Sequence, residues 1–308
     1  MKKSTTIIIF LFIAIVLVVV SLSKKQQIVK NTKAIVAVTT FSLYDITKHI
    51  AGSSVNIVNI LPFGVDPHDY EPTPKTMANI EKASLVLYSG AGLEPWTHGF
   101  SFKNRVVDIS QFMQLRELQK DDIHEHEHKH GDEVVDPHYW LNFSNMAKAT
   151  QLITDELVRI MPKNKILYLK NRDTYLAMLK KLDTHFNNQL AQCERDTIIV
   201  NHNAFGYLAQ RYNFHVESLS GLSPDAQPNA KNVMRLINTI KEHNVSTVFF
   251  ESFASDRAIK SIANEAHAIV KVLQPLGNIT ADEAKQELTY ESMMEENLLK
   301  LSEALSCH

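Results

Sequence analysis

The sequence predicts an α/β protein in which two parallel-sheet lobes are joined by one long rigid helix, with a cleft between the lobes. Short apolar strands alternate with helical segments in the first half, and the same alternation returns in the second half. Between the halves, apolar residues recur at helical spacing for nearly 30 residues. Strands that alternate with helices favour parallel sheets. A chain of 308 residues is long enough for about two domains.

The N-terminus has the pattern of an export signal. Lys2 and Lys3 precede an apolar stretch over residues 7–22, and Ser21-Leu22-Ser23 is a small-x-small pattern that suits signal peptidase. At 16 residues, the apolar stretch is shorter than the roughly 20 residues that cross a bilayer comfortably. We interpret residues 1–23 as a signal peptide, with an uncleaved N-terminal anchor as the alternative.

The first lobe is expected over residues 33–144. Its strands are predicted at 33–39, 55–61 and 84–89, and its helices at 42–51 and 74–83. Residues 116–135 break this pattern because they are charged, rich in histidine and without an apolar period. They are predicted to form a mobile surface loop.

A helical segment over residues 145–192 is expected to link the lobes. One helix is predicted over 145–161, Pro162 interrupts it, and a longer helix follows over 163–192. Its apolar residues at helical spacing are Ile166, Leu167, Leu169, Tyr175, Leu176, Leu179, Leu182, Phe186 and Leu190. A helix of this length can act as a rigid spine between two lobes.

The second lobe is expected over residues 193–308. Strands are predicted at 197–200, 214–219, 245–250 and 268–273. Helices are predicted at 204–211, 230–243, 257–266 and 289–306.

Composition excludes several classes of function. The net charge of −2 leaves no basic field for nucleic acid, and two cysteines cannot build a four-cysteine zinc module. The chain lacks a Walker loop, a Gly-x-Ser-x-Gly motif and a Cys-x-x-Cys motif. It does contain 14 histidines.

Three of these histidines are predicted to lie where ligands bind in α/β proteins. The tetrapeptide Val-Asp-Pro-His occurs twice and ends at His68 and at His138, while His202 follows a predicted strand. Proline stiffens each loop and directs the imidazole that follows. Because ligands bind beyond the carboxyl ends of parallel strands, the three imidazoles are expected to converge in the cleft as a zinc or transition-metal site. The alternative is that each is an ordinary surface or hydrogen-bonded histidine.

The predicted loop is a second metal-binding signal. His124, His126, His128 and His130 alternate with charged residues, a composition that binds zinc, nickel or copper loosely. The tract also matches His-Glu-x-x-His, but every neighbouring residue is charged or histidine. A metalloprotease helix needs an apolar face beneath the metal, so this match does not indicate a protease.

Several long motifs resemble one known family. They are Asp66-Pro-His-Asp-Tyr-Glu-Pro-Thr-Pro, Tyr88-Ser-Gly-Ala-Gly-Leu-Glu-Pro-Trp96, Asp136-Pro-His-Tyr-Trp-Leu141, His202-Asn-Ala-Phe-Gly-Tyr207 and Leu273-Gln-Pro-Leu-Gly277. In order and length they closely resemble the periplasmic zinc-binding proteins of zinc ABC importers, the ZnuA type. The wider metal-binding cluster of solute-binding proteins also serves manganese. The resemblance runs from about residue 33 to the C-terminus.

The resemblance implies that His68, His138 and His202 are the metal ligands in a cleft between two α/β lobes. Manganese members usually carry a carboxylate where His202 stands, so a third imidazole favours zinc. The resemblance also implies that the protein passes the ion to an inner-membrane ABC permease. The histidine-rich loop before the second ligand is typical of the zinc members.

The fourth coordination position departs from the family pattern. Gln274 stands where the family often has aspartate or glutamate, so this position is expected to hold water, the Gln274 oxygen or a histidine from the loop. Glu251 follows a predicted strand and is a weaker candidate ligand, better interpreted as a supporting carboxylate. Asp66 and Asp136 either orient the imidazoles or serve only as turn residues before proline.

We therefore expect an exported, monomeric zinc-binding protein of the periplasm that catalyses no reaction and binds no nucleic acid. Neither cysteine lies near the signal, which argues against lipidation; Cys193 and Cys307 either form one disulfide or remain thiols. The alternatives are a manganese or broad divalent-metal binder, a secreted zinc hydrolase with Glu251 or Glu71 as its base, and an adhesin with a structural metal.

Overall fold

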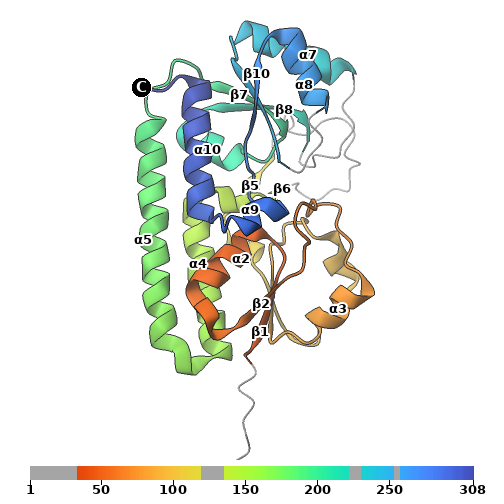
Figure 1. Ribbon diagram of the computed structural model, residues 1–308, viewed down its shortest axis with the longest axis vertical. Helices are drawn as coiled ribbons and strands as arrows, with labels where there is room; N and C mark the ends of the chain where they lie inside the picture. The colour runs from red at the N-terminus through yellow and green to blue at the C-terminus, as the bar shows by residue number, and fades with distance from the viewer. Residues whose placement is uncertain (1–32, 119–134, 222–229, 253–256) are drawn as a thin grey trace, which may run out of the picture. The chain divides into compact units, whose positions relative to one another are not determined.

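A computed structural model describes residues 33–118, 135–221, 230–252 and 257–308. Within it, Ala34–His308 forms one compact unit (Figure 1). The histidine-rich tract over 124–130 and the expected signal peptide lie outside the described residues. In the part of the chain that is described, no helix has both the length and the apolar character that a membrane span requires.

Two four-stranded parallel sheets confirm the predicted fold class. The first has the order β2-β1-β3-β4 and the second the order β10-β9-β7-β8. The strands of the first sheet are β1 (Ile35–Val38), β2 (Asn56–Asn59), β3 (Leu85–Tyr88) and β4 (Arg105–Asp108). The strands of the second are β7 (Thr197–His202), β8 (His215–Ser220), β9 (Thr247–Phe250) and β10 (Ile269–Val272).

Helices cover both sheets and run between them (Figure 1). The first half contains α2 (Phe41–Ala51), α3 (Pro74–Ile80) and α4 (Phe143–Ile160), and the long helix α5 spans Lys165–Gln189. The second half contains α6 (Gly206–Tyr212), α7 (Ala230–Glu242), α8 (Arg257–Ala266), α9 (Ala281–Lys285) and α10 (Tyr290–Leu305). Helix α5 begins just after Pro162 and packs against α2, α4 and α10.

One hydrophobic core extends through both sheets. It contains Val36 and Leu87 of the first sheet and Ile198 and Phe249 of the second, connected through buried residues of α4, α5 and α10. Smaller clusters line the other faces of the two sheets. Because the main core is shared, the two lobes are not separate folding units packed side by side.

The chain after β10 returns to the first sheet. The amide of Phe41 donates to the Gly277 carbonyl over 2.9 Å, and the amide of Gly64 donates to the Ile279 carbonyl over 2.9 Å. The Asn278 side chain donates to two carbonyls of the 62–65 loop. The C-terminal part of the expected second lobe therefore also builds the first.

Two sequence predictions need correction. The segment 116–135 is not loop throughout, because β5 (Arg116–Glu117) pairs antiparallel with β6 (Val135–Asp136) and closes the base of the histidine-rich segment. Ile166 and Leu167 were expected on the apolar face of α5, yet they are 86% and 47% exposed. The first buried residue of α5 is Tyr168, so the buried face of the helix begins after its first turn.

Candidate metal centre

Three histidines come together from three separate segments. His68 lies in the loop between β2 and α3, His138 lies two residues after β6, and His202 is the last residue of β7. His138 and His202 are each 2% exposed, and His68 is half-buried. One ring nitrogen of each lies within 4.8 Å of the others, and no other such group of histidine, cysteine or acidic side chains occurs among the described residues.

The spacing of the ring nitrogens matches a tetrahedral metal site. Nε2 of His138 lies 3.3 Å from Nε2 of His68 and 3.3 Å from Nε2 of His202. A tetrahedron with zinc–nitrogen bonds of 2.0–2.1 Å has edges of about 3.3–3.4 Å. Two of the three edges therefore match a zinc site, and the ring nitrogens of the third pair, His68 and His202, lie within 4.8 Å of each other.

The repeated Val-Asp-Pro-His sequence makes the same local turn twice. Oδ1 of Asp66 accepts from the His68 amide over 2.9 Å, and Oδ1 of Asp136 accepts from the His138 amide over 2.9 Å. An aspartate that accepts from the amide two residues later fixes the backbone of the turn. Both aspartates are therefore turn residues that set the direction of the imidazole.

Two carboxylates also contact the rings. Oδ1 of Asp136 lies 2.9 Å from Nδ1 of His138, and the Glu251 carboxylate contacts Nδ1 of His202. A carboxylate on Nδ1 fixes the tautomer, leaving Nε2 as the metal-binding atom. In this structure Glu251 supports His202.

The pKa values of the three histidines are shifted in different directions. Burial, together with the neighbouring imidazoles His138 and His202, lowers the pKa of His68 well below its usual value. Burial also lowers the pKa of His138, although Asp136 acts against it. Burial opposes charge on His202 too, but the carboxylates of Glu251, Asp66 and Asp136 together raise its pKa. Neutral imidazoles, the form that binds metal, are thus favoured at two of the three positions.

Comparison with known proteins gives the family. The chain matches the family described as "Zinc-uptake complex component A periplasmic" over residues 36–304. It belongs to this family. It is 33% identical over 286 residues to the high-affinity zinc uptake system protein ZnuA of Bacillus subtilis, with 90% of this chain and 89% of that protein covered.

Streptococcal proteins show the same relationship over part of their length. The zinc-binding lipoprotein AdcA of Streptococcus pneumoniae is 31% identical over 278 residues, which cover 88% of this chain and 56% of AdcA. The crystal structure of the Zn(II)-bound ZnuA-like domain of AdcA has a TM-score of 0.74 at 29% identity, with 89% of this chain and 99% of that domain covered. The chain thus corresponds to a whole ZnuA-like domain.

Gln274, the position where this ZnuA-family chain departs from the expected pattern, is buried. Its side-chain amide donates to Ser252 Oγ over 2.7 Å and to the Glu283 carboxylate, which fixes the orientation of the amide group. Its Oε1 atom is buried and has no hydrogen-bond donor in the described structure. Gln274 therefore retains an acceptor oxygen without a donor, and its role at the fourth position stays a prediction.

Two residues that sequence reasoning did not assign also support the centre. Arg116 Nε lies 3.2 Å from Asp136 Oδ2, and the Tyr207 hydroxyl donates to the Asp136 carbonyl over 2.8 Å. Tyr207 also accepts from the Arg116 amide. Tyr207 stands in the motif that begins at His202, but its contact with Asp136 depends on the tertiary fold.

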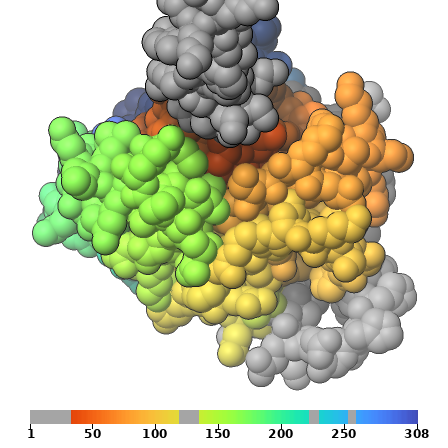
Figure 2. All heavy atoms as spheres, turned by 90° about the horizontal axis from the view of Figure 1, so that it is seen from below, coloured from red at the N-terminus to blue at the C-terminus, as the bar shows by residue number. Residues whose placement is uncertain are grey.

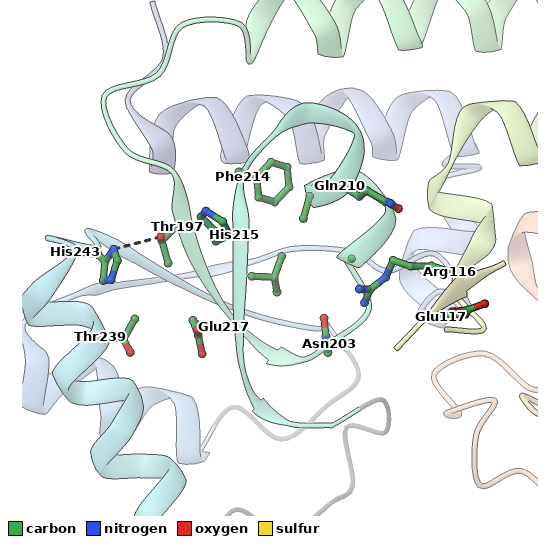
Figure 3. A pocket seen from close by; sticks show the side chains of 13 residues that line it. Arg116, Glu117, Thr197, Asn203, Gln210, Phe214, His215, Glu217, Thr239 and His243 are labelled. Carbon is green, nitrogen blue, oxygen red and sulfur yellow. Dashed lines mark hydrogen bonds between the residues drawn. The ribbon is translucent and has the colours of Figure 1, made fainter. Parts of the chain in front are cut away.

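A solvent-facing cavity of about 430 Å³ lies beside the β5–β6 ribbon (Figure 3). Its lining includes Arg116, Asn203, Phe214, His215 and His243, and none of the three clustered histidines. The histidine cluster is therefore not part of this cavity.

The two cysteines are brought together at the end of the chain. Cys193 and Cys307 form a disulfide across 114 residues of sequence. It connects the segment after α5 to the segment after α10.

Proposed function

We propose that this chain captures Zn²⁺ outside the cytoplasmic membrane and delivers it to the permease of an ABC importer. His68, His138 and His202 are the proposed ligands. The observation that carries the proposal is the pair of 3.3 Å distances between Nε2 atoms, which match the edges of a zinc tetrahedron. The role is binding and release, and no catalytic step is assigned.

The donor set favours zinc over manganese. The cluster offers three imidazole nitrogens, and the carboxylates of Asp136 and Glu251 are engaged by Nδ1 of two of the rings. Imidazole suits zinc, whereas manganese prefers carboxylate and water oxygens. The zinc-related names of the relatives agree with this choice.

We assign the fourth position to the Gln274 amide oxygen or to a water that it holds. A neutral oxygen donor binds zinc more weakly than a carboxylate, which suits a protein that must release its ion. Glu251 is assigned the task of holding His202, because its carboxylate contacts Nδ1 of that ring.

The first experiment is calorimetric titration with zinc and with manganese, for wild type and His202→Ala. The expected result is one tight zinc site that His202→Ala removes, with weaker binding to the histidine-rich tract left in both proteins. His215→Ala serves as the control, because His215 lines the cavity beside the ribbon and is not part of the cluster. A tight site that survives His202→Ala, or one that prefers manganese, would overturn the proposal.

The tract over 124–130 is assigned an auxiliary role in gathering zinc. Its base is closed by the β5–β6 ribbon, two residues before His138. Deleting residues 124–130 should therefore leave the affinity of the cluster nearly unchanged while lowering the total number of zinc ions bound. A large loss of affinity at the cluster would show instead that the tract supplies a ligand.

We further propose that the protein is exported as a periplasmic monomer without a lipid anchor. The N-terminal pattern and the absence of a cysteine near it support this assignment. Mass spectrometry of the protein from the soluble and membrane fractions of its native cells tests it, because a signal-cleaved soluble chain and a lipidated chain differ in mass and in the fraction that contains them.

A further inference from the structure

The first turn of α5 carries an exposed apolar pair. Ile166 is 86% exposed and Leu167 is 47% exposed. The next residue, Tyr168, is buried, and its hydroxyl lies 2.6 Å from Ser54 Oγ. The packing of Tyr168 therefore fixes the helical turn that carries Ile166 and Leu167.

The same stretch is strongly basic. Residues 157–171 contain Arg159, Lys163, Lys165 and Lys170 and no acidic residue. All four are exposed, and among the residues that the structure describes only Arg159 lies beside a carboxylate, that of Glu156. The result is a surface that combines two aliphatic side chains with three lysines, which we call the α5 basic-apolar surface (Lys163, Lys165, Ile166, Leu167 and Lys170).

This surface lies at the end of the fold where the described chain begins. Asn171 donates to the Ile50 carbonyl over 2.9 Å, which places the start of α5 against the end of α2. The Asn56 amide, two residues after Ser54, donates to the Ala34 carbonyl over 2.8 Å. Figure 2 views the protein from this end, with the green residues of the helical region on one side of the face and orange and yellow residues of the first half of the chain next to them.

We propose that the α5 basic-apolar surface rests on an anionic lipid surface. Aliphatic side chains beside lysines are the combination that binds the headgroup region of an anionic bilayer. Where residues 7–22 stay attached as an N-terminal anchor, the alternative to a cleaved signal peptide, they end about ten residues before the described fold, a length that spans at most about 35 Å. This surface is separate from the histidine cluster, so its test does not depend on the zinc assignment.

The test is binding to lipid vesicles by the chain from Lys24 onward, which contains the whole compact unit Ala34–His308. Vesicles of phosphatidylglycerol mixed with phosphatidylethanolamine are compared with vesicles of phosphatidylcholine. Wild type should bind the anionic vesicles, and binding should weaken as salt rises. An Ile166→Trp variant should show a blue-shifted emission on the same vesicles.

Two matched pairs of variants locate the contact. Ile166→Asp should weaken binding by at least about ten-fold, while Leu299→Asp, at an aliphatic residue that is 60% exposed on α10, should not. Lys163→Gln with Lys165→Gln should weaken binding about 25-fold, at about five-fold per lysine. Lys180→Gln with Lys181→Gln makes the same change of net charge further along α5 and should have little effect.

The proposal is overturned by vesicle binding that is absent, equal on both lipids, or unchanged in the Ile166 and lysine variants. Sedimentation of wild type and of Ile166→Asp tests the alternative that a second copy of the chain covers this surface. A dimer that Ile166→Asp dissociates would assign the surface to a second copy of the chain. Zinc titration and thermal melting of each variant show that the cluster and the fold are retained.

Discussion

At the level of single residues, the metal centre contains a buried carboxylate against a buried imidazole. Glu251 and His202 are 3% and 2% exposed, and the carboxylate contacts Nδ1 of the ring. This contact directs Nε2 toward the other two histidines and increases the basicity of the ring. Removing the charge while keeping the shape separates these effects from packing.

Glu251→Gln is expected to weaken zinc binding by about 10–100-fold, the usual effect of losing a carboxylate behind a metal-binding histidine. Calorimetry with zinc at neutral pH measures the change. Glu217→Gln is the matched control, because Glu217 is a carboxylate of the same half that pairs with Arg235. An unchanged affinity in Glu251→Gln would mean that packing alone orients His202.

The pKa directions predict how zinc affinity varies with pH. Zinc must displace the proton from His202, whose pKa is raised, so affinity should begin to fall at a pH above the ordinary histidine value of about 6.5. His68 and His138 have lowered pKa values and should contribute protons only below that value.

As pH falls, zinc affinity is therefore expected to decrease first because one proton binds to His202. At lower pH the decrease becomes steeper, because His68 and His138 also bind protons. Competition titrations with a chelator at a series of pH values measure this decrease. In Glu251→Gln the onset should move to lower pH, because the raising influence on His202 is weaker. An onset that stays in place in this variant would contradict the assignment of the first proton to His202.

At the level of elements, the sequence predicted the regular parts well and the short ones poorly. Helix α5 was expected over 163–192 and spans Lys165–Gln189, because Pro162 and a long apolar period define it. β4, β5 and β6 were not predicted, because two to four residues with few apolar side chains carry little pattern. Their pairing depends on neighbours that are distant in sequence.

The candidate site was predictable to a similar degree. The Asp-Pro-His repeat and His202 could be identified, because proline loops and strand ends leave local signals. That Glu251 contacts His202 while Gln274 contacts Glu283 could not be predicted, because nothing local fixes which side chains meet beyond the ends of the strands and on α9.

The loop after β3 is held by one buried carboxylate. Glu94 accepts from the amides of Ser89 and Gly90, each over 2.8 Å, and from the Thr39 hydroxyl. Burial raises its pKa to about 7. A side chain at Gly90 would collide with Asp108, so the loop has little freedom to rearrange.

Glu94→Gln should destabilise the protein by about 1–3 kcal/mol, because the new amide group leaves a backbone donor without an acceptor. The folded-state pKa of Glu94 is raised, so its contribution to stability is full below about pH 4.5 and is lost as pH rises through 7. The difference between wild type and variant should therefore be larger at pH 5 than at pH 8.

Denaturant unfolding at these two pH values measures the effect. Glu81→Gln is the control, since Glu81 is a carboxylate at the surface of the same half. If the stability difference between wild type and Glu94→Gln grows from pH 5 to pH 8 instead, Glu94 is ionised at both pH values.

For the whole molecule, the shared core explains why the two halves form one compact unit. The sequence predicted two lobes and a linking helix, but it did not predict that Phe41 and Gly64 bond to residues 277 and 279. Such contacts join chain segments more than 200 residues apart, and no local pattern indicates them. The shared core holds the loops of the three histidines in one framework before any ion binds.

The disulfide adds a covalent closure to this framework, and its loss should affect stability but not zinc binding. The double variant Cys193→Ser with Cys307→Ser removes the covalent link between two residues that are 114 positions apart in the sequence. Loop entropy then predicts a loss of about 5 kcal/mol. For a chain of this size that loss corresponds to a fall in Tm of about 10 °C.

Zinc affinity should stay the same, because the contacts of His68, His138 and His202 involve neither cysteine. Calorimetric melting with and without zinc gives both quantities, and wild type treated with a reductant should reproduce the variant. A loss of zinc affinity in the variant would mean that the chain end positions the metal centre as well as stabilising the fold.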